Sequence, residues 1–454
     1  MHRKSYPSIV LGVTLLGLII FALMSWNVSG ETIVVDGQGG GNYTSIQQAI
    51  DNSTDGDTIQ VWAGTYQENI VVNRSISLLG NGTNETIIEN VDEDTSVSLM
   101  VSSNNVQIGG MVFSNERPYP LDAACRISTN HSTFRDLYFS NTSLHIEHTG
   151  HSIFTKNKQS FSGGSDGYFS LKSSSNNVIS NSIFIDTGDF GNFFSMFNSS
   201  NTIIMGNEFH TPRTAIYITS GFRSSEYPDP ISHNNSIIDN HLRNIPQGHG
   251  LFGIDLQHSR HTRIEGNEIG GFPYAMQIFK SDDTRIERNS FFDSWFNRCI
   301  IVGNSSGVYI LNNDFSEKCS EIHFNPSCEY VEIHNNRFFR QSDHYSFHDI
   351  QNDGNATVNA TENWWGHPSG PYQQHQNPDG KGVGVGDNIL FSPWLDEQGN
   401  LVYLKDPEED ANPLSLVFLL INLLVFSACL VIVVRMPDSD FSLVPQNSHQ
   451  RKDP

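Results

Sequence analysis

The sequence predicts an all-β solenoid, a parallel β-helix whose coils are aligned by a column of asparagines. A phrase recurs between residues 100 and 365: an apolar residue, Asn three positions later, and an apolar residue five positions later, as in Thr284–Phe291. It returns about every 24 residues, a period that fits three short strands and three turns per coil. Asn, Gly, Ser and β-branched residues fill the repeats, which disfavours a helical solenoid.

Each repeat begins with an apolar residue, which we call its anchor. Positions are counted from the anchor, so the Asn three residues later is the third position and the apolar residue five residues later is the fifth. The anchors are Ile108, Phe134, Phe154, Val178, Ile204, Ile237, Ile264, Ile286, Ile310 and Ile333, and Ala360 continues the series. From Phe154 onward the third position is always Asn, at Asn157, Asn181, Asn207, Asn240, Asn267, Asn289, Asn313, Asn336 and Asn363. The fifth position is usually large and apolar, from Ile183 to Trp365, although Gln159 takes it in one repeat.

The spacing within the phrase predicts a bend at the Asn. The anchor and the fifth position are an odd number of residues apart, so one straight strand would point them to opposite faces. A bend lets both face inward, and Asn tolerates the left-handed backbone that the bend needs. The amides would then stack about 4.8 Å apart and bond to the coils above and below. Leucine-rich repeats also have an Asn ladder, but their Leu-x-x-Leu-x-Leu-x-x-Asn phrase is absent.

The N-terminal end of the solenoid is predicted to be capped by a short helix. Ile46, Ala49 and Ile50 have amphipathic helical spacing, and Thr44 or Ser45 precedes them as a cap. A strand is expected at 57–62, with a turn at 64–66.

The ends of the chain are predicted to lie outside the solenoid. A basic start and the apolar run Ile9–Met24 have the layout of a signal peptide, with an uncleaved anchor as the alternative. Leu414–Val434 is long enough to span a bilayer, and Arg435 after it places the C-terminus inside. We therefore expect a signal peptide or anchor at 1–30, the solenoid at 31–398, an acidic linker at 399–413, a transmembrane helix at 414–434 and a cytoplasmic tail at 435–454.

The composition limits which classes of binding partner the protein can have. The formal net charge is −23, which argues against a nucleic acid or an anionic membrane surface because phosphates would be repelled. Thirteen Asn-x-Ser/Thr sequons fit an exported chain, although an Asn-rich and Ser-rich sequence also produces them by chance. Pairing of Cys319 with Cys328 or with Cys299 is open, and either would suit an oxidising exterior.

Segments at both ends resemble known β-helix proteins. Asp57–Val61, Ala63–Asn69 and Ser75–Gly80 look like the opening of pectin-lyase-like right-handed parallel β-helix proteins. Asn363–Pro371 with Phe391–Trp394 looks like the terminal coil of archaeal and bacterial surface β-helix proteins. The repeats also resemble the β-helix protein of copper maturation for nitrous oxide reductase. The resemblance implies a right-handed helix of about 10–13 coils and export, but no particular reaction, because this scaffold hosts many activities.

No complete catalytic motif of that superfamily is present. The Gln-Asp, Asp-Phe-Ile-Phe-Gly and Gly-Arg-Pro-Trp segments of its pectin esterases are absent. Its polygalacturonases carry Asn-Thr-Asp, Asp-Asp, Gly-His-Gly and Arg-Ile-Lys, whereas this chain has related phrases in a different order, with Glu for Lys. Hydrolysis needs carboxylates that converge on one groove. The catalytic candidates are Asp255, Asp282, Asp283 and His249.

A binding groove is predicted beside the longest repeat interval, Ile204–Ile237, because insertions in a solenoid become loops on one face. The binding candidates are Tyr217, Arg223 and Tyr227, beside His249 and Asp255. Arg263 and Arg285 form a further column, next to a column of Glu265 and Glu287. The alternatives are a passive loop and a solvated face of salt-bridged columns.

The sequence offers two candidate metal sites. His145, Glu147 and His148 form a His/Glu cluster, although strand alternation separates His148 unless a turn intervenes. Asp379 and Asp387 lie in a Gly-rich loop that could hold Ca²⁺, but turn chemistry also explains them.

The resulting functional hypothesis is a cell-surface, single-pass membrane protein that binds extracellular carbohydrate or acts as an adhesion scaffold without catalysis. A tethered polysaccharide lyase or glycoside hydrolase is the first alternative. A metal-handling maturation factor is the second.

Overall fold

The computed structural model describes residues 30–90, 97–115, 124–161, 169–188, 191–220, 232–245, 251–296, 298–316, 318–339 and 349–404. The predicted signal peptide, except Gly30, and the predicted transmembrane helix and tail lie outside the described residues. Within those ranges no helix is long and apolar enough to cross a membrane.

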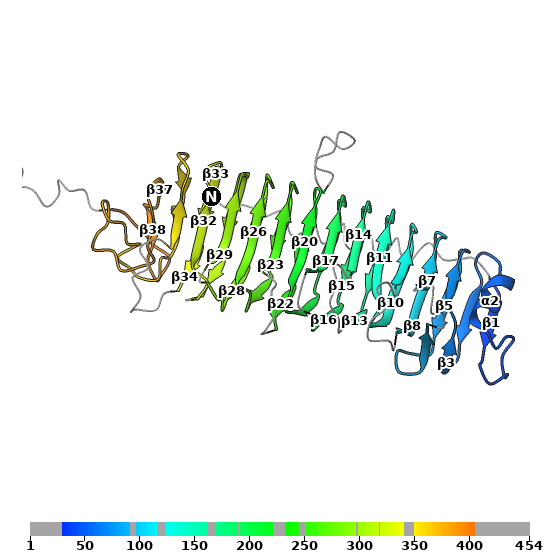
Figure 1. The fold of residues 1–454 in the computed structure, drawn as a ribbon. Helices are drawn as coiled ribbons and strands as arrows, with labels where there is room; N and C mark the ends of the chain where they lie inside the picture. Colours follow the sequence, from blue (N-terminus) through cyan, green and yellow to red (C-terminus); the bar gives the residue numbers. More distant parts are fainter. Residues whose placement is uncertain are drawn as a thin grey trace, which may run out of the picture. The chain divides into compact units, whose positions relative to one another are not determined.

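The chain forms a parallel β-solenoid, as predicted (Figure 1). Each regular coil contributes three strands, two to a 25-stranded sheet and one to a 12-stranded sheet. The 12-stranded sheet consists of β4 (Ile70–Val72), β7 (Val97–Val101), β9 (Ala124–Ile127), β11 (Ser143–Glu147), β14 (Phe169–Lys172), β17 (Asn192–Phe197), β20 (Thr214–Thr219), β23 (Phe252–Gln257), β26 (Tyr274–Phe279), β29 (Arg298–Gly303), β32 (Glu321–Phe324) and β35 (Ile350–Asn352).

The 25-stranded sheet carries the predicted anchors and fifth positions. It consists of β1 (Thr32–Val35), β2 (Thr58–Val61), β3 (Gly64–Gln67), β5 (Ser77–Gly80), β6 (Thr86–Glu89), β8 (Gln107–Ser114), β10 (Thr133–Ser140), β12 (Ile153–Thr155), β13 (Lys158–Phe161), β15 (Val178–Ser180), β16 (Ile183–Asp186), β18 (Ile203–Met205), β19 (Glu208–Thr211), β21 (Ser236–Ile238), β22 (His241–Asn244), β24 (Arg263–Glu265), β25 (Glu268–Gly270), β27 (Arg285–Glu287), β28 (Ser290–Phe292), β30 (Ser306–Leu311), β31 (Asp314–Phe315), β33 (Glu329–His334), β34 (Arg337–Phe338), β36 (Val358–Asn359) and β37 (Ile389–Leu390). A small antiparallel pair, β38 (Trp394–Leu395) and β39 (Leu401–Val402), follows.

Buried asparagines form a hydrogen-bonded column at the bend between the two strands of the large sheet. Between Asn207 and Asn363, each member donates from Nδ2 to Oδ1 of the next over 2.9–3.0 Å. The backbone N–H of each member donates to the same oxygen. Each amide is thus satisfied inside the solenoid, where an unpaired polar group would be costly.

The predicted ladder is wrong in the coil of Asn181. The anchor, ladder and fifth positions of this coil are Ile179, Ser182 and Phe184, each one residue later than predicted. The Ser182 hydroxyl accepts the backbone N–H of Asn157, and the Ser182 N–H donates to Asn207. Asn181 is exposed instead. The prediction was wrong there because a serine hydroxyl can fill the position of the amide.

The left-handed backbone also lies elsewhere than predicted. It belongs to the residue before each ladder position, not to the ladder residue. These residues have φ between 50° and 66° and are Lys156, Asn181, Gly206, Asp239, Gly266, Arg288, Asn312, Asn335 and Glu362. The side chain of each ladder residue therefore hydrogen-bonds to the neighbouring coils and not to its own bend.

A second column of polar side chains lies in the turns that follow the 12-stranded sheet. In each of these turns a Ser or Thr hydroxyl accepts a hydrogen bond from a backbone N–H in the equivalent turn of the preceding coil. The acceptors are Thr149, Ser174, Ser199, Ser232, Ser281 and Ser305. The aromatic fifth positions stack in the interior, as in Phe291, Phe315, Phe338 and Trp365, whose successive ring centroids lie 4.8–5.1 Å apart.

A helix covers the first coil, as predicted. Helix α2 (Ile46–Asn52) buries Ile46, Ala49 and Ile50, and Ser45 caps it by accepting the N–H of Gln48. The predicted turn at 64–66 is wrong, because this segment is strand β3, paired with β6.

A charged pair is buried inside the solenoid. Arg213 Nε lies 2.6 Å from Asp186 Oδ2, and both side chains are fully buried. Asp186 also accepts hydrogen bonds from the backbone of Gly188 and the hydroxyl of Thr211. Burial raises the pKa of Asp186 to about 6, and the Arg213 charge opposes that rise.

One disulfide links adjacent coils. Cys299 pairs with Cys319, which decides between the two pairings that the sequence left open, and Cys328 is a buried free thiol. A disulfide between neighbouring coils fits an oxidising compartment.

Candidate functional site

The outer face of the 12-stranded sheet gathers polar and aromatic side chains. In β23, Ile254 and Leu256 point into the core, so the alternating Asp255 and Gln257 point outward. The parallel register aligns Asp255 with Tyr217 of β20 and with Gln277 of β26. Side chains from three successive coils therefore meet at one place, which we call the Asp255 cluster: Tyr217, Asp255, Gln257 and Gln277.

Amide groups surround the Asp255 carboxylate. Gln257 Nε2 donates to Oδ2 over 3.0 Å, and Gln277 Nε2 donates to Oδ1 over 3.2 Å. The Tyr217 hydroxyl donates to Gln257 Oε1 over 3.4 Å, and the Tyr217 ring packs edge-on against Phe197. Asp255 itself is only 6% exposed. Burial raises its pKa to about 6, although the two amide bonds lower it. Burial also raises the pKa of Tyr217.

The raised pKa of Asp255 predicts a loss of stability with rising pH. Because the folded carboxyl, with a pKa of about 6 against 3.8 for an ordinary Asp, holds its proton more tightly than the unfolded one, folding is favoured at low pH. Between about pH 4 and 6 this group should lower the free energy of unfolding by up to about 3 kcal/mol. Asp255→Asn, which cannot ionise, should remove that part of the pH dependence in denaturant titrations. Asp282→Asn is the control, and parallel curves for Asp255→Asn and the wild type would contradict the prediction.

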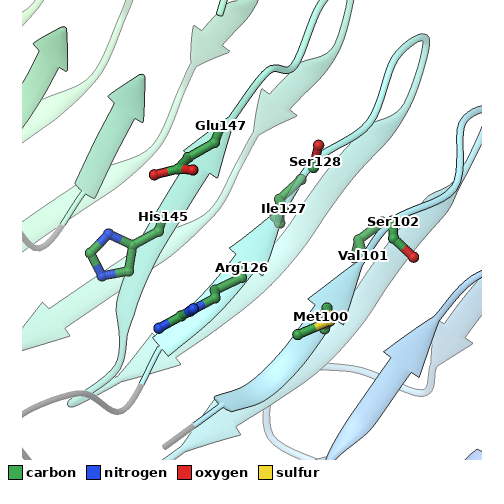
Figure 2. A pocket seen from close by; sticks show the side chains of 8 residues that line it. All are labelled: Met100, Val101, Ser102, Arg126, Ile127, Ser128, His145 and Glu147. Atoms are coloured by element: carbon green, nitrogen blue, oxygen red, sulfur yellow. The ribbon is translucent and has the colours of Figure 1, made fainter. Parts of the chain in front are cut away.

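A pocket lies on the same outer face, nearer the N-terminus. It measures about 410 Å³ and is lined by Met100, Val101, Ser102, Arg126, Ile127, Ser128, His145 and Glu147. Figure 2 shows that Met100, Arg126 and His145 project from three neighbouring strands to the same side. Glu147 lies 3.9 Å from Lys172 of the next coil. We call this site the Arg126 pocket. It offers a guanidinium, an imidazole, hydroxyls and a thioether to a ligand.

The predicted arginine column lies on the other sheet. Arg263 and Arg285 are neighbours on β24 and β27 of the 25-stranded sheet. Arg263 pairs with Glu265, and Arg285 Nε lies 2.9 Å from Glu287 Oε2. The structure therefore does not bring these arginines together with Tyr217 and Asp255, and it favours the salt-bridged face that the sequence offered as the alternative.

The predicted acidic candidates are also separated. Asp282 and Asp283 lie in the turn after β26, where Asp282 pairs with Arg260 at 3.5 Å and Asp283 with His261 at 3.3 Å. Both contacts hold neighbouring turns together. Neither residue joins Asp255 in the middle of its strand. The remaining candidates Arg223, Tyr227 and His249 lie outside the described residues.

The predicted metal ligands do not form a cluster. His145 and Glu147 do share the outer face of β11, but His148 sits in the following turn with a φ of 50°. Asp387 accepts a hydrogen bond from Gln373, and Asp379 is exposed. Across the described ranges, no group of three or more His, Cys, Asp or Glu side chains is arranged to hold a metal ion.

Sequence reasoning missed Arg126, Gln257 and Gln277. The signal that could have found them is strand alternation in the third strand of each coil. In β23 it marks every second residue as outward, and the repeat period then aligns those positions between coils.

The described coils agree with a known family and with solved folds. Residues 231–367 match the family described as "right handed beta helix region". Tailspike protein 3 of bacteriophage CBA120 has a TM-score of 0.54 at 12% identity, covering 80% of this chain and 61% of that chain. The A-module of mannuronan C-5 epimerase AlgE6 from Azotobacter vinelandii has a TM-score of 0.50 at 13% identity, covering 77% and 93%. At these identities the likeness shows the fold, a right-handed parallel β-solenoid.

Curated relatives match shorter stretches. A cell surface glycoprotein of Methanothermus fervidus is 37% identical over 101 residues, which is 22% of this chain and 16% of that protein. Probable pectinesterase 67 of Arabidopsis thaliana is 28% identical over 146 residues, which is 26% of this chain and 42% of that protein. The chain thus spans about a sixth and about two fifths of the length of these relatives.

Proposed function

We propose that this right-handed β-helix is a cell-surface protein that binds extracellular carbohydrate on the outer face of its 12-stranded sheet. The observation that carries the proposal is the in-register Asp255 cluster on the same face as the Arg126 pocket. Parallel strands repeat every 4.8 Å or so along that face, which suits a linear polymer better than a compact ligand. Aromatic and amide side chains are suited to pack against and bond with sugar rings.

The surface location rests on three supports. The relative from Methanothermus fervidus is itself a cell surface glycoprotein. The Cys299–Cys319 disulfide fits an exported chain. The two apolar runs of the sequence, Ile9–Met24 and Leu414–Val434, have the lengths of a signal peptide and a membrane anchor. We therefore propose a single-pass anchor with the solenoid outside the cell.

The test is a binding assay with the full-length chain in detergent against a panel of neutral and acidic polysaccharides. The expected result is measurable affinity for at least one of them. Tyr217→Ala and Arg126→Ala should each weaken that affinity at least tenfold, about 1.4 kcal/mol, because each removes a contact on the outer face. The measurement is calorimetric titration or retention on immobilised polysaccharide.

Arg285→Ala is the matched control, because this arginine lies on the other sheet and pairs with Glu287. It should leave affinity unchanged. No binding to any polysaccharide, or equal losses in Arg285→Ala and Arg126→Ala, would refute the proposed face.

We propose a tethered polysaccharide lyase or hydrolase as the alternative, with Asp255, held on the outer face by Gln257 and Gln277, as the group that would carry it. The pKa of Asp255, raised to about 6 by burial, suits a group that exchanges protons near neutral pH. In that case incubation with the bound polysaccharide should release unsaturated or new reducing ends, and Asp255→Asn should abolish their release. Binding without such products would leave the non-catalytic role as the function.

A further inference from the structure

We infer that the turns following the 12-stranded sheet carry N-linked glycans, and that the folded structure selects which sequons accept them. Twelve of the thirteen Asn-x-Ser/Thr sequons lie in the described residues. They differ sharply in the exposure and hydrogen bonding of the asparagine. The inference is independent of carbohydrate binding by the sheet.

Three acceptor asparagines stand exposed in equivalent turns. Asn73 follows β4, Asn304 follows β29, and Asn355 lies three residues past the end of β35. All three side chains are exposed. None of the three forms a side-chain hydrogen bond within the described ranges of the chain. Since β4, β29 and β35 are all strands of the 12-stranded sheet, these acceptors lie along one edge of it.

Two identical tripeptides test the effect of structure directly. Asn355-Ala-Thr357 and Asn359-Ala-Thr361 have the same sequence and lie four residues apart. Asn355 is exposed in a turn, whereas Asn359 is half-buried in β36. Asn359 Nδ2 donates to Glu332 Oε2 over 2.8 Å, and its Oδ1 accepts from the Thr361 hydroxyl over 3.1 Å.

The environment of Asn359 opposes modification. Its strand is paired on one side with β33 and on the other with β37. A sugar on Nδ2 would have to displace the Glu332 contact between neighbouring coils. Asn355 can carry the same sugar into solvent without breaking any contact.

A second matched pair supports the same rule. Asn198-Ser-Ser200 and Asn304-Ser-Ser306 are also identical tripeptides, with nearly equal φ values of 49° and 50° at the asparagine. Asn304 is exposed, but Asn198 is half-buried and its side-chain oxygen is shut off from solvent. We assign Asn304 as the acceptor and Asn198 as unmodified.

The chemistry requires a donor from the host cell, a lipid-linked oligosaccharide phosphate. The bond between the anomeric carbon and the phosphate oxygen breaks, and a bond from that carbon to the asparagine Nδ2 forms. The lipid phosphate leaves as an anion, and the amide loses one proton. The product adds a large solvated group at a surface turn.

The test is peptide mass spectrometry of the full-length chain produced in a host with N-glycosylation machinery, with a reference glycoprotein secreted from the same cells. Glycan mass is expected on Asn73, Asn304 and Asn355, and none on Asn198 or Asn359. Asn355→Gln should lower the mass of the intact chain by one glycan, and Asn359→Gln should leave the glycan mass unchanged. Glycan on Asn359 at the level of Asn355, or an unmodified chain beside a modified reference, would overturn the inference.

Discussion

Replacing Arg213 with methionine is expected to lower the free energy of unfolding by about 3–5 kcal/mol, because it leaves the Asp186 carboxylate buried without its counter-charge. Methionine is close to arginine in length and apolar, so little of the loss should come from packing. The difference in the free energy of unfolding between the wild type and Arg213→Met should grow between pH 5 and pH 8. Without Arg213 the folded Asp186 has a pKa further above its unfolded value, so stability falls as the group is forced to ionise. Denaturant unfolding at several pH values measures this.

The double variant Asp186→Leu/Arg213→Met is the control. Removing both charges should restore most of the lost stability, since a buried ion pair often contributes little beyond apolar residues of similar volume. A double variant as unstable as Arg213→Met alone would show that the arginine acts through packing. In that case the interpretation of the pair as an electrostatic unit would fail.

Asn289→Ala is expected to lower the free energy of unfolding by a similar amount, about 3–5 kcal/mol. The change removes the donors to Asn313 and to the carbonyls of Ile264 and Glu287. It also leaves two buried N–H groups of Asn267 without their acceptor. Each unsatisfied buried group costs about 1–3 kcal/mol. Amide hydrogen exchange should speed up first in the coils containing Asn267 and Asn313, because coils of a solenoid contact only their neighbours.

Asn181→Gly is the matched control for the ladder. Asn181 occupies the third position of the repeat by sequence, but it is exposed and has a φ of 50°. Glycine adopts that conformation without strain, so the change should cost less than about 1 kcal/mol. If it destabilises the chain as much as Asn289→Ala, the assignment of Ser182 to the ladder is wrong.

The coil could be predicted from the sequence because its signal is local and repeated. Anchor, Asn and aromatic fifth position recur with one spacing, and every coil must satisfy the same interior. A local pattern was not sufficient in the coil that contains Ser182. Val178 and Ile179 are both apolar, so the phrase fits at either offset. The equal spacing of 25 residues from Phe154 to Ile179 and from Ile179 to Ile204 was the signal that favoured the second.

The candidate site could be predicted only in part. Tyr217 and Asp255 were proposed from their place beside the longest repeat interval, and the structure brings them into register. Gln257 and Gln277 were missed because amides are common in this sequence and carry no local pattern. The buried pair of Asp186 and Arg213 was also missed. Asp186 and Arg213 are 27 residues apart in the sequence, and no neighbouring residue in the sequence distinguishes Arg213 from a surface arginine.

The asparagine column also makes each coil depend on both of its neighbours. From Asn207 to Asn336 each side-chain Nδ2 donates to the Oδ1 of the next coil and to a backbone carbonyl of the preceding coil, so one amide links three successive coils. Amides linked in this way polarise one another, so each coil added to the column strengthens the hydrogen bonds of those beside it. Asn363 ends the column, and its Nδ2 donates to the carbonyls of Ile333, Ala360 and Thr361.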